Sequence, residues 1–443
     1  MANTGNGWRL RNFTQIPDFK SRLLWTFLIL VVVRLGAQIP VPGVSRDVFA
    51  SWFENQSSSA ATLFDMMTGG SFSQMSIFAL SITPYITASI IMQLMTIIIP
   101  ALEELQKDQD GREKMREYTF YLAIALSALQ AVAMGIGFYR SGSLQTHSIF
   151  AMVLVMVALV TGGIVLVFLG EEITKHGIGN GISMILLFNI ISRLPQDIGM
   201  LYETFMKGRN IVKAGLALLV ILAVIIFMVV FVVYLHDGFI KIPIQNSQKI
   251  QGRRSVGSAG DHLPFKINSA NVIPVIFAGS LMSMPALVCQ FIGKTPGGIA
   301  GEIIKALSQN NWFNPSAWKY TLGAILYAVL VIAFAYFYTS ITFNPQIVAE
   351  RLKERGSFIP GHRPGKQTVE YLQSVSNSTI FIGAVGLLIV ALVPIFFSGV
   401  FGADVSFGGT SLIIIVGVIL ETIRQLDSKV AQRQLSGILT KRK

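Results

Sequence analysis

The chain has 443 residues, of which 52% are hydrophobic and only 13% are charged, and its mean hydropathy is +0.60. An ordinary soluble domain is about 25% charged, so this composition argues against a soluble protein and indicates a membrane protein. The net charge of +12 would suit nucleic-acid binding, but lysine and arginine in the cytoplasmic loops of a membrane protein explain it better. The single cysteine, Cys289, cannot form an intrachain disulfide.

Ten stretches of the sequence are apolar and long enough to cross a bilayer as helices, which takes roughly 20 residues each. Backbone polar groups in lipid must pair within their own segment, so each stretch is predicted to be helical. The first stretch ends in IPVPG rather than in a small-residue cleavage site, which favours a retained helix over a signal peptide. The predicted spans are 22–39, 74–99, 117–138, 149–170, 178–195, 211–235, 269–292, 317–343, 376–398 and 409–426.

Positive charge is concentrated in every second gap between these spans. Of the 35 lysines and arginines, 25 lie in the N-terminal segment as far as Arg22, in the C-terminal tail from Arg424 and in the gaps 100–116, 171–177, 236–268 and 344–375. The alternate gaps, counted with Lys213, hold 7, and Arg34, Arg193 and Lys319 lie within spans. Cytoplasmic loops carry the excess of lysine and arginine in membrane proteins. This bias predicts that both termini lie in the cytoplasm.

Prolines interrupt two of the predicted spans. The second span contains Pro84 and follows the polar stretch TLFDMMTGGSFSQM, and the seventh contains Pro274 and Pro285. If spans 1–5 and 6–10 form two halves, these are the second spans of each half, as in an inverted repeat with a functional site at its interface. Prolines are also simply tolerated in membrane helices, and position alone does not decide between the two interpretations.

Acidic residues are absent from the middle of every predicted span. Glu171, Glu172 and Glu421 lie near span ends, and Asp65 precedes the second span. Proton- and ion-coupled transporters usually keep an ionisable group at mid-membrane. Its absence argues against a coupled transporter without excluding one, since Na⁺ can be held by carbonyl groups.

No catalytic motif is complete in this sequence. GKT at 293–295 resembles the end of a phosphate-binding loop, but Val288 occupies the position of the required glycine. GIGNG at 177–181 is not a dinucleotide fingerprint and is predicted to be a tight turn at a helix start. The five histidines lack metal-ligand spacing. The sequence therefore predicts no enzyme, no catalytic residue, no cofactor and no metal site.

Two long basic gaps indicate a docking surface. The gap 236–268 contains QKIQGRRSVG, and the gap 344–375 contains ERLKERGSFIPGHRPGKQ. Connections of this length usually carry a function or are disordered. Glycine and proline flank Arg253, Arg254 and Arg363, which predicts turns that present these guanidinium groups to phosphate or carboxylate partners. Any one of these arginines alone is adequately explained as topology charge.

Eight motifs, in order and at matching spacing, resemble the SecY family, whose members are channel subunits of the bacterial protein-conducting translocon and relatives of eukaryotic Sec61-alpha. The resemblance runs from about residue 20 to about residue 435 and is weak at both ends. The motifs are RLGAQIPVPG at 34–43, SIFALSITPYITASIIMQL at 76–94, GIGNGIS at 177–183, QGRR at 251–254, HLPFKIN at 262–268, FNPQ at 343–346, PGHRPGKQT at 360–368 and FGGTSL at 407–412.

The resemblance implies an all-α membrane protein shaped as an hourglass, with ten helices in two pseudo-symmetric inverted halves. The implied divisions are a cytoplasmic N-terminal segment at 1–21, halves at 22–200 and 201–427, and a cytoplasmic tail at 428–443. Six apolar side chains are implied to close the waist: Ile82, Ile86, Leu186, Ile190, Ile276 and Ile414. Leu186 departs from the isoleucine of the family pattern but keeps its bulk.

The resemblance also implies a plug, a lateral gate and a docking site. The plug is a short helix at about 62–73 that contains Leu63, Phe64, Asp65, Met66, Met67, Thr68, Gly69 and Gly70. The lateral gate between spans 2 and 7 contains Thr87, Ile90, Gln93, Ile276 and Met282. The docking contacts are Arg253, Arg254 and Arg363. The adjacent glycines Gly69 and Gly70 predict a plug that is compact but weakly held.

The implied function is a protein-conducting channel that moves unfolded secretory polypeptides across the bacterial inner membrane and releases membrane helices into lipid. The implied partners are small SecE-like and SecG-like subunits, the SecA motor, the ribosome, signal sequences, nascent chains and the lipid bilayer. A secondary transporter of a small solute, built on inverted repeats, is the alternative. A channel has an apolar waist between polar funnels, whereas a transporter has a polar site at mid-membrane.

Overall fold

The computed structural model describes the greater part of the chain. The described residues are 19–46, 48–49, 65, 68–107, 109–142, 144, 146, 148–205, 211–246, 249–251, 254–256, 261–292, 298–313, 318–401 and 409–440. They form two compact units. Unit 1 comprises Met1–Gly199, Met284–Ile304 and Val418–Lys443, and unit 2 comprises Met200–Ser283 and Lys305–Gly417.

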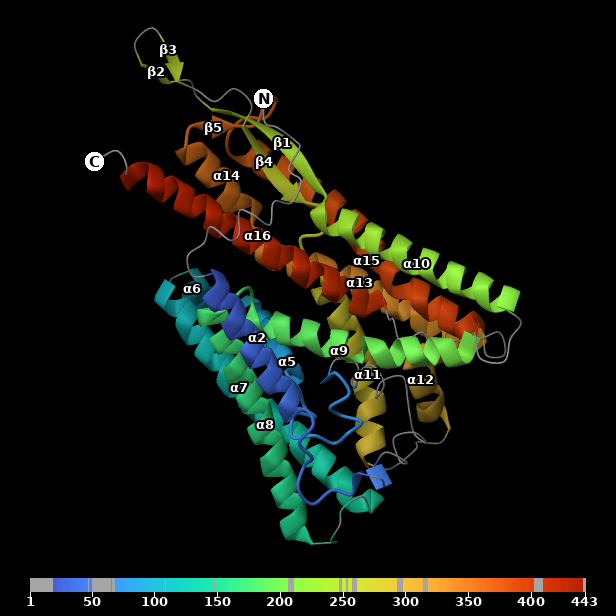
Figure 1. Ribbon diagram of the computed structural model, residues 1–443. Helices are drawn as coiled ribbons and strands as arrows, with labels where there is room; N and C mark the ends of the chain where they lie inside the picture. The colour runs from blue at the N-terminus through green and yellow to red at the C-terminus, as the bar shows by residue number, and fades with distance from the viewer. Residues whose placement is uncertain are drawn as a thin grey trace. The chain divides into compact units, whose positions relative to one another are not determined.

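Unit 1 is a helical assembly with two apolar clusters. Its helices in chain order are α2 (Phe19–Gly36), α5 (Thr83–Ile98), α6 (Pro100–Lys107), α7 (Gln109–Ser141), α8 (Ile149–His176) and most of α9 (Gly181–Phe205). Helix α7 packs against α5 and α8, and α2 packs against α8 (Figure 1). One cluster is centred on Phe49, Phe72 and Met75, and the other on Val33, Ile82 and Ile185.

Unit 2 combines long helices with short strands. It contains α10 (Ile211–Asp237), the 3-10 helices η1 (Gln309–Asn311) and η2 (Trp318–Thr321), α13 (Leu322–Thr342), α14 (Pro345–Glu354) and α15 (Lys366–Phe401). Its strands are β1 (Phe239–Asn246), β2 (Lys249–Gln251), β3 (Arg254–Val256), β4 (Asp261–Lys266) and β5 (Ser357–Phe358). Helices α11 (Ile273–Ile292), α12 (Ile299–Leu307) and α16 (Gly409–Thr440) contribute residues to both units.

Each of the ten predicted membrane spans coincides with a helix. Five described stretches are by themselves long and apolar enough to cross a membrane: Asp110–Tyr139, Ile149–His176, Leu218–Asp237, Trp318–Glu354 and Lys366–Phe396. Several helices run past the predicted ends, because polar residues extend a helix beyond its apolar part. Helix α16, for example, continues to Thr440 rather than ending near residue 426.

The predicted start of the second span was wrong. Helix α5 begins at Thr83 rather than at residue 74, and Pro84 lies in its first turn, where a missing N–H costs nothing. Pro274 likewise lies at the start of α11, so only Pro285 interrupts that helix. The apolar residues before Thr83 are not helical, because their backbone takes other partners.

Residues 68–82 form consecutive turns inside unit 1. The N–H of Ile77 donates to the carbonyl of Ile39 at 2.9 Å, and the N–H of Val41 donates to the carbonyl of Met75 at 2.9 Å. Met75 and Ser81 adopt positive φ angles of 47° and 51°. Non-helical backbone is tolerated in a membrane protein only where protein buries it or water reaches it. Here the described backbone is buried against α2, α7 and α8.

The predicted tight turn at GIGNG is confirmed. Gly179 has a φ of +76°, and the Asn180 side chain accepts hydrogen bonds from the first N–H groups of α9. The Ile178 N–H donates to the Thr26 hydroxyl of α2 at 3.0 Å. A Cβ on Gly177 would stand 2.5 Å from that same hydroxyl. The GIGNG motif therefore allows α2 to pack closely against the turn that connects α8 to α9.

Two adjacent glycines of α8 provide a matched test of this packing. A Cβ on Gly162 would stand 2.1 Å from the carbonyl oxygen of Ile77, whereas a Cβ on Gly163 would meet only Ser127 Oγ, at 3.5 Å. We expect Gly162→Ala to destabilise the protein by about 1–3 kcal/mol through overpacking. Gly163→Ala should be neutral or stabilising by up to about 1 kcal/mol. Thermal unfolding of both purified variants in detergent checks this, and equal melting temperatures would contradict the close approach of α8.

Candidate functional site

The described part of the predicted plug, Asp65 and residues 68–73, is arranged around one buried carboxylate and is here called the plug segment. Asp65 is only 1% exposed. Its Oδ1 accepts the N–H of Ser73 at 2.7 Å, and its carbonyl accepts the Thr68 hydroxyl at 3.0 Å and the Gly70 N–H at 3.0 Å. Asp65 therefore ties the two ends of the segment together. Leu63, Phe64, Met66 and Met67 lie outside the described residues.

Two arginines from transmembrane helices hold this segment. Arg193 of α9, itself buried, forms an ion pair with Asp65 through Nη1 and Oδ2. Arg34 of α2 donates to the carbonyl of Gly69 at 3.0 Å and to Ser192 Oγ at 3.2 Å. Both helices thus contact the plug segment through charged groups.

The other end of the plug segment is apolar and buried. Phe72 is 2% exposed and Met75 is fully buried. The Phe72 and Phe49 rings meet edge to face, with centroids 5.7 Å apart. The described residues on both sides of the glycines are therefore held, while the weak hold expected of the segment as a whole stays a prediction. The two glycines do supply positive φ angles, 69° at Gly69 and 82° at Gly70, but a salt bridge and an aromatic core fix the chain on either side of them.

Four of the predicted waist residues lie in unit 1, on α5 or at its start and on α9. Ile82 is fully buried, and Ile86 packs against the same cluster between α2, α8 and α9. Leu186 and Ile190 are buried on α9. They lie within one helical turn of Asn189, whose backbone oxygen would be 2.9 Å from a Cβ on Gly69.

The remaining predicted waist and gate residues are each placed on their own helix. Ile276 and Met282 lie on α11, and Ile414 lies near the start of α16, all within unit 2. Thr87, Ile90 and Gln93 lie on α5 of unit 1. The Thr87 hydroxyl donates to the carbonyl of Thr83, and Gln93 contacts Ser89 on the same helix.

A small sheet in unit 2 joins the two basic gaps. β1 pairs antiparallel with β4 over Phe239–Ile244, and with β5 at Gln245 and Asn246, giving the order β4–β1–β5. The sequence predicted turns but no strands here. β5 lies about a hundred residues after β1, and β4 follows β1 only after the β2–β3 hairpin. Apolar residues of the sheet pack on α14 and the start of α15 at one end of the long helices (Figure 1). The members of this cluster include Ile242, Phe265, Ala349, Ile359 and Leu372.

Arg363 lies exposed on a turn with a defined structure. Its N–H donates to Gln367 Oε1 at 3.1 Å, and its carbonyl accepts the Thr368 hydroxyl at 2.9 Å. Gly361 and Gly365 on either side have φ angles of 87° and 107°. The guanidinium group is thus presented from fixed backbone. Arg254 begins β3, which pairs with β2, and Arg253 lies outside the described residues.

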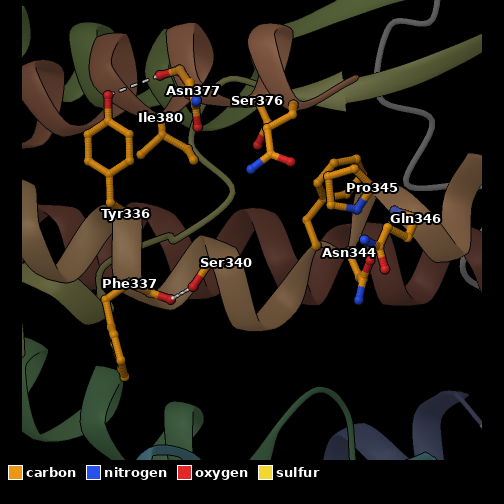
Figure 2. Close-up of a pocket in the computed structure, with 11 residues that line it drawn as sticks. Tyr336, Phe337, Ser340, Asn344, Pro345, Gln346, Ser376, Asn377 and Ile380 are labelled. Atoms are coloured by element: carbon orange, nitrogen blue, oxygen red, sulfur yellow. Dashed lines mark hydrogen bonds between the residues drawn. The ribbon is translucent and has the colours of Figure 1, made fainter. Parts of the chain in front are cut away.

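Beside this sheet, a recess of about 520 Å³ opens between α13, α14 and α15. Figure 2 shows the Tyr336 hydroxyl donating to the carbonyl of Asn377, at 3.2 Å, on one side of the recess. On the other side, the Asn344 side chain caps α14 by accepting the N–H groups of Gln346 and Ile347. The FNPQ motif thus lines a polar recess. Among the described residues, no group of three or more histidine, cysteine, aspartate or glutamate side chains could hold a metal ion.

The fold and these contacts define a multi-pass helical membrane protein in which mostly buried turns at residues 69–82 precede α5. The chain belongs to the SecY family: the family model described as SecY matches residues 76–423. The protein translocase subunit SecY of Streptomyces scabiei is 39% identical over 439 residues, covering 96% of this chain and 97% of that protein. The subunit of Bacillus subtilis is 38% identical, covering 97% and 99%.

Solved structures share the fold. The structure described as that of a protein conducting channel has a TM-score of 0.60 at 21% identity, and 92% of each chain is covered. The Sec61 chain of the canine ribosome-channel complex from the endoplasmic reticulum has a TM-score of 0.58 at 20% identity, with the same coverage. A channel structure whose description states that the plug domain of SecY stabilises the closed state and maintains a membrane seal has a TM-score of 0.61 at 22% identity, also with 92% of each chain covered.

Sequence reasoning missed the arginines that hold the plug segment. Arg34 and Arg193 were noted only as charges within predicted spans. Ionisable residues inside a membrane are rare and usually functional. Asp65 is a carboxylate just before the second span. The rarity of charges inside a membrane could therefore have suggested that an arginine within a span pairs with Asp65.

The glycine pair of the plug segment provides a second matched test. Gly69→Ala would drive a Cβ to 2.9 Å from the carbonyl oxygen of Asn189, whereas a Cβ on Gly70 meets nothing within 4 Å. Both changes pay roughly 1–2 kcal/mol for the left-handed backbone. Gly69→Ala alone also pushes the segment off α9. We expect a cysteine at Ser71, which is 3% exposed, to react with a water-soluble maleimide at least about tenfold faster in Gly69→Ala than in Gly70→Ala.

This labelling is done with Cys289 replaced by alanine, so that position 71 is the only thiol. Equal labelling rates in the two variants would show that Gly69 does not rest against α9.

Proposed function

We propose that this chain is the central subunit of a channel that moves unfolded secretory polypeptides across a membrane and releases membrane-protein helices into lipid. Similarity to protein translocase subunits along nearly the whole chain carries this proposal. The described geometry supports it, because the buried apolar residues Leu186 and Ile190 of α9 lie within one helical turn of Asn189, which Gly69 of the plug segment closely approaches.

The waist consists of Ile82, Ile86, Leu186, Ile190, Ile276 and Ile414. A passing polypeptide offers every kind of side chain, so the pore cannot rely on specific hydrogen bonds. An apolar constriction resists wetting and blocks ions when it is empty. It can also close around a moving strand without binding it tightly.

The lateral gate lies between α5 and α11, with Thr87, Ile90 and Gln93 on the first helix and Ile276 and Met282 on the second. An apolar segment of the substrate leaves sideways by partitioning into lipid. Leucine and isoleucine at mid-membrane gain about 0.3–0.6 kcal/mol each, whereas a charged residue costs roughly 2.5–3.5 kcal/mol. The channel therefore needs only to expose the segment, and the energy for transport comes from an external motor.

The β4–β1–β5 sheet, the β2–β3 hairpin and the Arg363 turn form the docking surface for that motor. The solved relatives described in ribosome complexes support the ribosome as one partner, and the SecA motor is the other. Small SecE-like and SecG-like subunits complete the channel. The basic surface suits both partners, because guanidinium groups bind phosphate and carboxylate equally well.

The chain lies in the bacterial inner membrane with both termini in the cytoplasm, as the bias of lysine and arginine requires. It is organised as a cytoplasmic segment at 1–21, two halves at 22–200 and 201–427, and a cytoplasmic tail from 428. The alternative, a solute transporter, finds no support in the described residues. The buried carboxylate Asp65 is neutralised by Arg193 rather than left to bind a coupling ion.

Charge reversal at Arg363 tests the docking surface. Losing one contact in a desolvated charged interface costs about 2–5 kcal/mol, so Arg363→Glu should abolish motor- or ribosome-driven transport while the protein still inserts and folds. The measurement is secretion of a reporter in cells, with the amount of inserted channel quantified. Arg355→Glu, an exposed arginine beyond α14, is the control for net charge. Normal secretion by a stably inserted Arg363→Glu variant would refute the assignment.

Polar substitution at the waist tests the seal. Ile414→Asn, and separately the pair Ile86→Asn and Ile276→Asn, should wet the constriction and raise the resting ion conductance. Weak signal sequences should then be accepted more readily, because less energy is needed to open the channel. Single-channel recording of purified protein in planar bilayers is the measurement, with Val157→Asn on an exposed face of α8 as control. If all variants keep the wild-type resting conductance, these residues do not form the barrier.

A further inference from the structure

The plug segment is held at its two ends by different physical interactions. Phe72 and Met75 are embedded in an apolar cluster with residues of α7 and α8. Asp65 and Gly69, at the other end, make an ion pair with Arg193 and a hydrogen bond with Arg34, besides the close approach of Gly69 to Asn189. The apolar end requires a whole core to open, whereas the polar end can be released by separating a few charged atoms.

The ionic contacts meet on one strip of α9. Arg193 pairs with Asp65, and its neighbour Ser192 accepts from Arg34 at 3.2 Å while donating to the carbonyl of Asn189 at 2.8 Å. Arg34 therefore bridges the plug carbonyl at Gly69 and the hydroxyl next to Arg193. The Asp65–Arg193 ion pair and the Arg34 hydrogen bonds thus meet at the adjacent residues Ser192 and Arg193, and together they are called the ionic network.

Buried charges have a property that apolar contacts lack. In a dry interior the attraction between Asp65 and Arg193 is strong, but taking both charges out of water is costly. When water enters, each charge regains its hydration and the attraction falls. The network therefore holds firmly in the sealed state and costs little to leave separated once the pore is hydrated.

We propose that Asp65, Arg193 and Arg34 are positioning residues that latch the plug segment in the resting channel, and that they set how readily the channel opens. The segment swings on the apolar end at Phe72 and Met75 and is released at the ionic end. The effect of the latch on channel opening rests on the proposed channel function, whereas the contacts that form the latch lie within unit 1.

A labelling experiment tests the latch without any transport step. The channel complex carries Ser71→Cys and Cys289→Ala, and the probe is a membrane-impermeant maleimide. Arg193→Gln or Asp65→Asn leaves the remaining charge buried without its partner, so we expect labelling at least about tenfold faster than in the parent. The double variant Asp65→Asn with Arg193→Gln has no buried charge of this pair and should return to within about threefold of the parent rate. Arg34→Gln should accelerate labelling on its own.

The control is Arg46→Gln, an arginine of unit 1 that donates to the carbonyl of Gln38 and does not contact the plug segment. A purely structural role predicts that the two single changes add, so that the double variant is at least as reactive as either. Labelling at the parent rate in both single variants, or an additive double variant, would overturn the latch. If one single variant fails to fold, the labelling rates of the other single variant and of the double variant still test the latch.

Ion conductance in planar bilayers then distinguishes the proposed channel function from the proposed latch. If the parent complex carries a secretory chain and the fast-labelling variants leak ions, the latch controls the channel. If the single variants label faster than a parent that transports nothing, the proposed function is refuted and the latch stands. A transporting parent whose single variants neither label faster nor leak would refute the latch alone.

Discussion

The structure of unit 1 depends on finding partners for backbone that is not helical in a protein surrounded by lipid. Residues 74–82 belong to what hydropathy presents as one apolar span with α5, yet they are not helical, and lipid offers their N–H and carbonyl groups nothing. The chain meets this constraint by pairing Ile77 and Val41 with neighbouring backbone and by giving the Gly69 carbonyl to Arg34. Gly162 of α8 has no side chain because Ile77 lies where its Cβ would be.

The position of the plug segment in unit 1 depends on this non-helical backbone being held by hydrogen bonds. The described residues of the plug segment can lie against α9 because hydrogen bonds and an ion pair satisfy their polar groups. The remaining cost is the burial of Asp65, which Arg193 offsets. Unit 2 solves a different problem, since its β4–β1–β5 sheet needs a small apolar core with α14 to fix the Arg363 turn. Sealing and docking thus have separate physical foundations in the two units.

Hydropathy and charge predicted the helices well, because length and lipid exposure are local properties of sequence. The start of α5 was missed since the residues before Thr83 are as apolar as the helix itself, and only partners elsewhere in the chain decide their backbone. The Asp65–Arg193 contact joins residues separated by 128 positions, and β1–β5 pairing likewise spans the chain. Family motifs indicated which residues matter at the waist and at Arg363, but not which arginines hold the plug segment.

The central claim is that a polypeptide passes through this chain beside the residues assigned to the waist. A photo-crosslinking amino acid at Ile86, in the assembled channel engaged with an arrested secretory chain, tests it most directly. The account predicts a crosslink to the mature part of the arrested chain. It predicts no such crosslink from Phe150 of α8, which is 76% exposed. Absence of the product at Ile86 with an engaged substrate, or equal products from both positions, would contradict the claim.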